Sequence, residues 1–372
     1  NAIYGARASN GVIVVSTKNA KKAGKIDIDF SANLTVYENK NVDYADNFYM
    51  TPSQQVDTEA AYWDYYFFDN DGEVADPLAS TANNIAMGTG AVSPIQYAFY
   101  QKALGNITDA QLQEQLASLK KNNYARDYAD AVYKQRVMQQ YNFSLRGRSD
   151  KFRNNLTVNY KYDNSGLVNH FNNQFNLQYK GDFDLTKWLT ATVSVNGIYG
   201  KQREAGYDYN GSYANIWAQP AYMPFYNADG TVKGQHYWYD GNDYMTFEDG
   251  FEDMSSNPVD EYYKNTSTSR RQYMRYHGEL LFKIIDGLTA NAQFVYESNH
   301  TTKEWYATQD SHLMRTMRNA YGSKDAEGNF TTMVPATGGY LQTTNTDGRY
   351  WTARGQVNYS KTFGKHEINA LA

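Results

Sequence analysis

The sequence has no cysteine among its 372 residues. This absence excludes disulfide bonds, Cys-ligated zinc, iron–sulfur clusters and thiol catalysis within the chain. No run reaches the roughly 18 consecutive apolar residues of a membrane-spanning helix, so any crossing of a membrane must use β-strands. The chain also lacks a basic block and has a net charge of −5, which argues against a nucleic-acid partner.

Aromatic residues, by contrast, are abundant. They make up 16% of the chain and include 35 Tyr, although the mean hydropathy is −0.74. A soluble globule this polar does not usually carry so many large rings, because each ring needs a surface to cover.

A period-two alternation of apolar and polar residues recurs along the chain. In the segment 171–185, Phe175 and Leu177 lie on one face while Gln174 and Asn176 lie on the other. This is the period of a β-strand with one apolar and one polar face. The same alternation marks eight further segments, 25–37, 141–145, 156–162, 189–199, 276–282, 288–296, 351–359 and 366–372.

The length and polarity of these segments favour a membrane barrel over a soluble sandwich. A strand of about 12 residues, tilted about 45°, spans about 28 Å, which matches the apolar band of a bilayer. The polar faces carry charges that a water-filled lumen accepts and a sandwich core does not, namely Lys161, Lys180, Asp182 and Arg354. Aromatic residues near the expected strand ends suit interfacial girdles, and these are Trp188, Tyr199, Tyr296 and Phe363.

The connections between the strands alternate in length. Residues 38–138, 201–269 and 302–348 form long connections, whereas GRSDKF, LTKW, IIDGL and FGKH are tight turns. In outer-membrane barrels the long loops lie outside the cell and the short turns lie in the periplasm. The sequence therefore predicts an all-β fold, a transmembrane antiparallel β-barrel, of which we count roughly nine strands.

The first long connection contains helical patterns. Pro52 opens a helix that we expect to run to Phe67. Thr108 is a candidate N-cap for a helix over 108–119, with Gln111 three residues later. A third helix is expected over 125–140. Together these helices would form a small extracellular cap.

The first eighteen residues, NAIYGARASNGVIVVSTK, have a different character. Gly5 and Asn10-Gly11 stand where the chain must turn. The run 12–15 is apolar on both faces and predicts a strand buried on both sides. We interpret residues 1–19 as the end of a small buried domain and residues 20–24 as a linker. Because the chain begins without Met or a signal peptide, we expect it to start inside a longer protein.

This stretch closely resembles the end of the plug domain of TonB-dependent outer-membrane transporters. The form RA-x-NG-V resembles the SusC/RagA branch of Bacteroidota more than the siderophore receptors, which tend to carry GG at that place. YNFSLRGRSDKFRNNLTVNYKYDNSGLVN resembles an early barrel hairpin of that branch, with Gly147-Arg148 where GG is usual, and KTFGKHEINALA resembles a later hairpin. The plug-motif residues in this chain are Tyr4, Gly5, Arg7, Asn10 and Gly11.

The resemblance implies a barrel of about 22 strands with a plug inside it. Residues 1–19 would then be the C-terminal end of the plug, 20–24 the hinge, and 25–372 the N-terminal part of the barrel. It also implies a location in the outer membrane, a SusD-like surface lipoprotein as partner, and import of a glycan or peptide. Energy would come from the TonB–ExbB–ExbD complex, acting through a segment upstream of residue 1.

Aromatic clusters in the long connections are the candidate substrate-binding residues. Sugar rings stack on such platforms, and neighbouring Asn and Asp side chains bond hydroxyl groups. The alternative is that the rings pack the loops together or contact the lipoprotein. The candidates are Trp63, Tyr66, Trp217, Tyr237, Trp238, Tyr239 and Trp305.

Motifs for catalysis and metal binding are absent from the sequence. It has no H-E-x-x-H, G-x-S-x-G, P-loop or G-x-G-x-x-G, so we expect no enzymatic activity, no metal site and no cofactor. The run 69–73, DNDGE, resembles half of a calcium loop, but Ser80 stands where the closing Glu belongs. A turn is therefore preferred there, with loop calcium as the minor alternative.

Two functions remain open from the sequence. The first is TonB-dependent import of a nutrient, and the second is a surface-binding or adhesion barrel without energised transport. A TonB box and a complete plug encoded upstream would decide for the first. Under the first function, the geometry of the loops would determine which nutrient is bound, and fold-level analogy does not supply that geometry.

Overall fold

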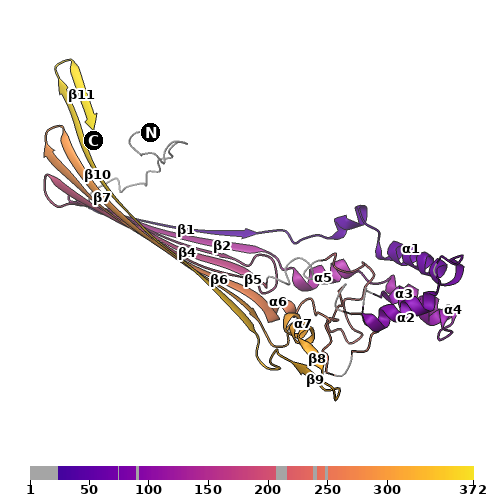
Figure 1. The fold of residues 1–372 in the computed structure, drawn as a ribbon. Coiled ribbons are helices and arrows are strands. Elements are labelled where there is room, and N and C mark those ends of the chain that lie inside the picture. The colour runs from indigo at the N-terminus through magenta and orange to yellow at the C-terminus, as the bar shows by residue number, and fades with distance from the viewer. Residues whose placement is uncertain (1–23, 74, 89–91, 207–215, 238–240, 248–249) are drawn as a thin grey trace.

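A computed structural model describes residues 24–372 except 74, 89–91, 207–215, 238–240 and 248–249. A long, twisted antiparallel sheet occupies one part of the molecule, and helices and loops extend beyond one end of its strands (Figure 1). The predicted plug segment 1–19, with Tyr4, Gly5, Arg7, Asn10 and Gly11, lies outside the described residues. So does the predicted hinge 20–24, except for Gly24.

The large sheet has nine strands in the order β1-β2-β3-β4-β5-β6-β7-β10-β11, and each strand pairs antiparallel with its neighbour. Each alternating segment of the sequence lies in one of these strands to within one residue, so the predicted all-β antiparallel sheet is confirmed. The strands are β1 (Lys25–Val36), β2 (Val137–Arg148), β3 (Phe152–Asp163), β4 (Phe171–Asp184), β5 (Leu189–Ala205), β6 (Asn265–Ile285), β7 (Leu288–Ala307), β10 (Tyr340–Phe363) and β11 (His366–Leu371). A separate hairpin consists of β8 (Gly322–Lys324) and β9 (Phe330–Thr332).

All long connections leave the sheet at the same end. Residues 37–136, 206–264 and 308–339 connect strands at the end where the helices lie, as does the shorter 164–170 (Figure 1). The tight turns, 149–151, 185–188, 286–287 and 364–365, lie at the opposite end. In the turn 286–287, Gly287 has φ +81°, and a Cβ there would lie 2.6 Å from the carbonyl oxygen of Ser360. The turn therefore requires glycine.

The strands are longer than the sequence pattern predicted. The expected loop 201–269 is shortened at both ends, because β5 continues to Ala205 and β6 begins at Asn265. Likewise, the expected loop 302–348 shrinks to 308–339, whereas the expected loop 38–138 becomes 37–136, because β1 ends one residue earlier and β2 begins two residues earlier than expected. The added residues are mostly polar on both faces, so they carry no apolar alternation. They still pair, because strand pairing joins backbone groups whatever the side chain.

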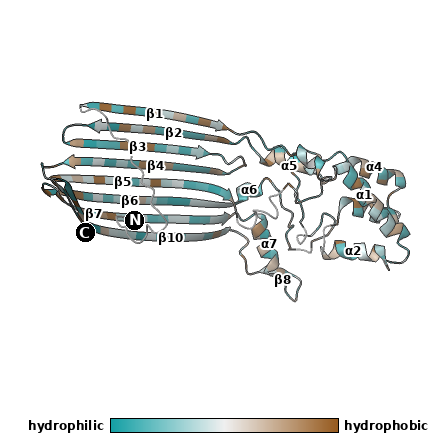
Figure 2. Ribbon diagram, turned by 90° about the horizontal axis from the view of Figure 1, so that it is seen from above, coloured by the Kyte–Doolittle hydropathy of each residue, from teal (hydrophilic) through white to brown (hydrophobic). Residues whose placement is uncertain are grey.

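One face of the sheet carries an apolar belt, whose edge nearer the cap is aromatic. Figure 2 shows the strands banded in teal and brown, the colours of the alternating polar and apolar residues. From Tyr199 to Leu189, the belt on β5 covers about 33 Å of strand, which is about 25 Å of height at the tilt of outer-membrane barrels. The edge of the belt nearer the tight turns includes Trp188, whose ring stacks on the ring of Phe282 with the centroids 6.2 Å apart. The edge nearer the cap contains two rows of register partners: Tyr141, Tyr160, Phe175 and Tyr199 on β2 to β5, and Tyr276, Tyr296 and Trp351 on β6, β7 and β10. Between the rows, Tyr199 pairs with Gln272 and Tyr276 with Val195.

This edge corrects one expectation. Tyr199 and Tyr296 lie within their strands rather than near strand ends, because β5 and β7 continue beyond the belt as paired polar segments. The outward surface is thus apolar only in the half nearer the tight turns.

The opposite face is polar and hydrogen-bonded across strands. Asn142, Asn159 and Asn176 are register partners on β2, β3 and β4. Asn176 Nδ2 donates to Asn159 Oδ1 (2.8 Å), Asn159 Nδ2 donates to Asn142 Oδ1 (2.6 Å), and Asn142 Nδ2 donates to Ser31 Oγ (3.2 Å). Each amide thereby bonds its neighbour on the next strand, so this part of the face is both polar and hydrogen-bonded.

Most of the helices lie in the first long connection. The sequence predicted α4 correctly, since Thr108 and Gln111 form a complete capping box. The expected helix 125–140 is wrong beyond Val132, because residues from Val137 onward pair with β1. The helices α2 and α3 were not expected. The helical elements are η3 (Asp43–Asn47), α1 (Pro52–Asp64), η4 (Tyr65–Asp69), α2 (Pro77–Met87), α3 (Pro94–Ala103), α4 (Asp109–Leu119), α5 (Tyr124–Val132), α6 (Glu261–Lys264) and α7 (His312–Ala320).

Two apolar clusters hold the connections together, and we call the whole assembly the cap. One cluster joins Tyr124, Tyr128 and Val132 of α5 to Phe225 and Tyr262 of the second connection. The other joins helices α1, α3 and α4 around Val56, Ile95, Phe99 and Leu112, with Tyr222 of the second connection inserted among them. No described helix has the length and apolar content needed to cross a membrane.

The apolar belt predicts that a lysine is more destabilising on the belt face of the sheet than on the polar face. Val193 lies in the middle of the belt and is 44% exposed. In the intact protein reconstituted in lipid, Val193→Lys is expected to reduce the free energy of unfolding by about 2–4 kcal/mol, because it places a charge at the bilayer midplane. Gln178→Lys, an exposed position on the polar face of β4, is the matched control and should change stability little. The free energy of unfolding of both variants is measured by urea titration. An equal decrease in the two variants would contradict the assignment of the two faces.

Candidate ligand-binding site in the cap

Three cavities of the cap surround Pro220, which lines all of them. The segment around Pro220 belongs to the second connection and lies between α1 and α5. Polar contacts hold it there: Tyr124 N donates to Ala221 O (2.9 Å), Ala221 N donates to Gln55 Oε1 (2.8 Å), and Asn122 Nδ2 donates to Tyr222 O (2.9 Å). The cavities therefore have walls from two distant parts of the chain.

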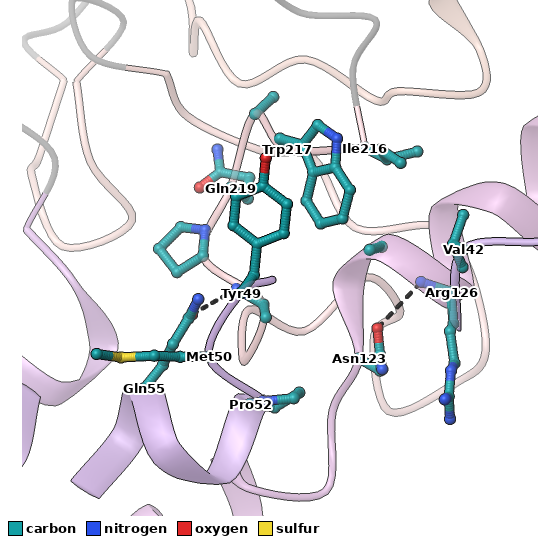
Figure 3. A pocket seen from close by; sticks show the side chains of 14 residues that line it. Val42, Tyr49, Met50, Pro52, Gln55, Asn123, Arg126, Ile216, Trp217 and Gln219 are labelled. Atoms are coloured by element: carbon teal, nitrogen blue, oxygen red, sulfur yellow. Dashed lines mark hydrogen bonds between the residues drawn. The ribbon is translucent and has the colours of Figure 1, made fainter. Parts of the chain in front are cut away.

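The first cavity has a volume of about 450 Å³ and an aromatic wall. The rings of Tyr49 and Trp217 lie 4.9 Å apart at 32°, and both remain accessible, at 58% and 41% exposure. The amides of Gln55, Asn123 and Gln219 lie around them (Figure 3). Aromatic rings beside amide groups provide both stacking and hydrogen bonding for a ligand.

Glu59 lines both the second and the third cavity and joins the segments between them by hydrogen bonds. Its carboxylate accepts hydrogen bonds from Trp63 Nε1 (3.0 Å), Ser93 Oγ and the hydroxyl of Tyr222. Tyr222 is 1% exposed. Burial, together with the negative charge of Glu59, raises the pKa of Tyr222 well above its usual range, so the hydroxyl stays protonated and donates. This contact ties helix α1 to the second connection.

A second polar cluster lies at the edge of the second cavity. His236 Nδ1 bonds Asp243 Oδ1 (2.8 Å), His236 Nε2 bonds Asp253 Oδ1 (2.9 Å), and Lys233 also pairs with Asp243. Burial alone would lower the pKa of His236, but the two carboxylates outweigh it and raise the pKa to about 9. Because both ring nitrogens bond carboxylates, this imidazolium joins two parts of the loop rather than serving a ligand.

A separate cavity of about 380 Å³ lies where β6, β7 and β10 meet the cap. Ser267, Lys303, Trp305, Gln342 and Thr344 line it. All five come from strands, so the paired sheet sets their spacing.

The structure distributes the predicted aromatic residues over several places. Trp217 lines the first cavity and Trp63 the open third cavity. Trp305 lies in the strand-end cavity, whereas Tyr237 is buried at 8% exposure. Tyr66 packs edge-on against Trp63 (5.1 Å, 82°) and does not line these cavities. Trp238 and Tyr239 lie outside the described residues.

Sequence reasoning missed Tyr49 and Glu59. No sequence pattern marks Tyr49 as a site residue, because the ring that it contacts, Trp217, belongs to another connection. Glu59 is one of several acidic residues in a helical segment, and only the fold brings Ser93 and Tyr222 to it. Sequence data contain no signal for either contact.

The run 69–73 forms a turn closed by its own groups. Gly72 N donates to Asn70 Oδ1 (3.0 Å) and Glu73 N to Asn70 O (2.8 Å). Among the described residues, no group of three or more His, Asp or Glu is arranged to hold a metal ion.

The comparisons with known proteins concern the fold. No protein-family model and no curated protein matches the sequence. Among solved structures, the chain resembles a chain of the RagAB peptide importer in the "closed-closed" state, with a TM-score of 0.63 and 16% identity over 99% of this chain. The RagAB peptide transporter and the "open-open" state of the importer give the same TM-score at 17% identity. The chain covers 36% of the length of these matches. Its sheet accordingly has the fold of part of a β-barrel.

The His236 cluster predicts a pH dependence. A pKa raised from 6.5 to about 9 means that the imidazolium contributes its full stabilisation below pH 6.5 and loses it as the pH rises through about 9. The exchange rate of the imidazole C2 hydrogen, followed by mass spectrometry in the full-length protein, should titrate near pH 9.

Replacing both Asp243 and Asp253 by Asn should bring that pKa below 6.5, because burial then acts alone. Asp229→Asn is the matched control, since Asp229 bonds Thr231 in the same connection. A wild-type titration near 6.5 would contradict the arrangement.

Proposed function

We propose that this chain is part of an outer-membrane barrel that imports a nutrient, either an oligosaccharide or a peptide. The observation that carries the proposal is the placement of every long connection at one end of a barrel-type sheet, where the connections fold into one cap with ligand-sized cavities. The likeness in fold to chains of RagAB peptide importers supports it. In a barrel whose turns are tight at the other end, the cap is the surface that a nutrient meets first.

The proposed mechanism divides the work between the cap and segments outside the described residues. The ligand binds in the cap, and residues 1–19 form the end of a plug that occludes the lumen, followed by a hinge at 20–24. The TonB–ExbB–ExbD complex pulls on a segment upstream of residue 1 and displaces part of the plug. Because the ligand shifts an equilibrium only by its differential binding, the conformational work comes from that complex. A SusD-like lipoprotein covers the cap. No catalytic step is part of this proposal.

The experiment compares uptake with binding. Cells that carry the full-length gene should accumulate the nutrient, and loss of TonB should abolish accumulation while leaving binding at the cell surface intact. Growth of a deletion strain on a panel of glycans and peptides identifies the nutrient. Binding with no dependence of uptake on TonB would instead establish a surface-binding barrel without energised transport.

The aromatic wall of the first cavity gives a residue-level prediction. Trp217→Ala, alone or with Tyr49→Ala, should weaken ligand binding about two- to tenfold, the range expected for one aromatic contact, and should lower uptake at limiting nutrient. Tyr263→Ala is the control, because Tyr263 is a 53% exposed ring of the cap that lines none of these cavities. Surface level, measured by antibody labelling, should be unchanged in both. Equal uptake by Trp217→Ala and wild type would remove Trp217 from the ligand path.

A further inference from the structure

The cavity at the ends of β6, β7 and β10 has a composition that differs from that of the cap cavities. Its residues form two rungs of the sheet: Ser267 pairs with Trp305 and Trp305 with Gln342, while Lys303 pairs with Thr344 in the next rung. All of them lie on the polar face, because the alternate residues of β6 and β10 form the apolar belt. The cavity therefore opens toward the interior side of the barrel wall.

The ring of Trp305 is held in one orientation. Its Nε1 donates to Oδ1 of Asn265 (2.8 Å), which is 1% exposed, and its ring lies edge-on to Tyr340 at 4.8 Å and 64°. A Cβ at Gly206 would lie 1.6 Å from Asn265 Oδ1 and 2.6 Å from Trp305 Nε1. The backbone at Gly206 thus packs directly against the hydrogen bond between Trp305 and Asn265. The indole ring therefore presents a fixed apolar surface to the cavity.

Each polar group of the cavity can donate a hydrogen bond to a ligand. Ser267 is 4% exposed, and its hydroxyl has no hydrogen-bond partner among the described residues. An unpaired buried hydroxyl costs free energy unless a ligand or water satisfies it. The oxygen of Gln342 already accepts from the hydroxyl of Tyr340 (2.9 Å), so its amide NH₂ remains to donate. Thr344 adds a second hydroxyl.

Lys303 supplies the charge. Its side chain is exposed, and no carboxylate in the described part of the chain pairs with it. Glu304, the next residue, lies on the other face and pairs with Arg270. Glu204 is the register partner of Ser267 on β5 and accepts from Gln202 (3.2 Å). Arg271, also on the polar face, adds a second positive charge and donates to Asn299 (3.4 Å). Lys303 and Arg271 against Glu204 leave these three groups of the polar face with a net charge of +1.

We propose that this cavity binds a carboxylate of the imported ligand, with the carboxylate on Lys303, Ser267 and Gln342 and the adjacent apolar part of the ligand on Trp305. One ammonium with neutral donors suits a singly charged, acceptor-only group, and charge-assisted hydrogen bonds are the strong ones. The volume of about 380 Å³ suits a single sugar or amino-acid unit. Two ligands present this chemistry, a peptide with a free C-terminal carboxylate and an oligosaccharide that ends in a uronic acid. The proposal rests on the proposed import function.

The test uses the full-length protein, purified in detergent, and calorimetric binding of matched probes. A short peptide is compared with its C-terminally amidated form, and a glucuronate-terminated oligosaccharide is compared with its glucose-terminated form. The carboxylate member of one pair should bind at least about tenfold more tightly, the value of one charge-assisted hydrogen bond. The pair that shows the preference identifies the source of the carboxylate.

Lys303→Gln should remove that preference and leave the affinity for the neutral member unchanged. Lys201→Gln is the matched control, because Lys201 is a lysine of β5 on the opposite face of the sheet, above the ring of Phe171. Ser267→Ala should reduce the preference in part. Retention of the full preference in Lys303→Gln, or equal binding of both members of each pair by the wild type, overturns the proposal. Absence of binding to all four probes also overturns it, since the cavity would then be filled by the rest of the chain.

TonB-dependent uptake is measured in parallel with the same variants. Uptake that persists without any preference for a carboxylate rejects this site and retains the import function. Loss of TonB dependence in the wild type rejects the import function, whatever the probes show.

Discussion

One continuous antiparallel register is the constraint on which the rest of the structure depends. Every strand of the large sheet pairs with its neighbour along the chain, so the backbone donors and acceptors of the inner strands, β2 to β7, are satisfied within the sheet. Because side chains alternate with a period of two, this register also decides which residues share a face. It places Asn142 beside Asn159 and Asn176 on one side, and Tyr276 beside Tyr296 and Trp351 on the other.

The cap follows from the same constraint. A meander with tight turns at one end sends its long connections to the other end, where they must pack on one another. Apolar contacts supply most of the packing, as where Tyr222 of the second connection lies within the helices of the first. Charged groups fix the relative positions. Arg318 of α7 bonds Glu252 through Nε (2.5 Å) and Nη2 (2.7 Å), which ties the third connection to the second. A bidentate contact of this kind restricts orientation as well as distance.

The sequence predicted the sheet better than the cap, for a physical reason. The nine strands and the long–short alternation follow from a local period, and the capping box at Thr108 and Gln111 follows from a local motif. The ends of β6 and β7 nearer the cap were predicted to be loops. Their pairing depends on backbone groups, which leave no pattern in the side chains. Within the cap, the contact of Tyr49 with Trp217 joins separate connections, and the predicted Trp63, Trp217 and Trp305 line three different cavities. The plug motif lies outside the described residues.

The tryptophans show how register converts one residue type into different roles. Trp351 is 71% exposed on the face of the belt, at its aromatic edge, where an indole suits a boundary between lipid and water. Trp305, on the adjacent strand, has the opposite parity relative to the belt and lies beside Lys303 and Gln342 on the polar face. Composition and hydropathy do not distinguish these two residues, whereas a shift of one residue in the pairing of β7 would move Trp305 to the face of the belt. The chemistry available to a ligand at the barrel wall is therefore a consequence of strand register, and the loops of the cap add to it rather than create it.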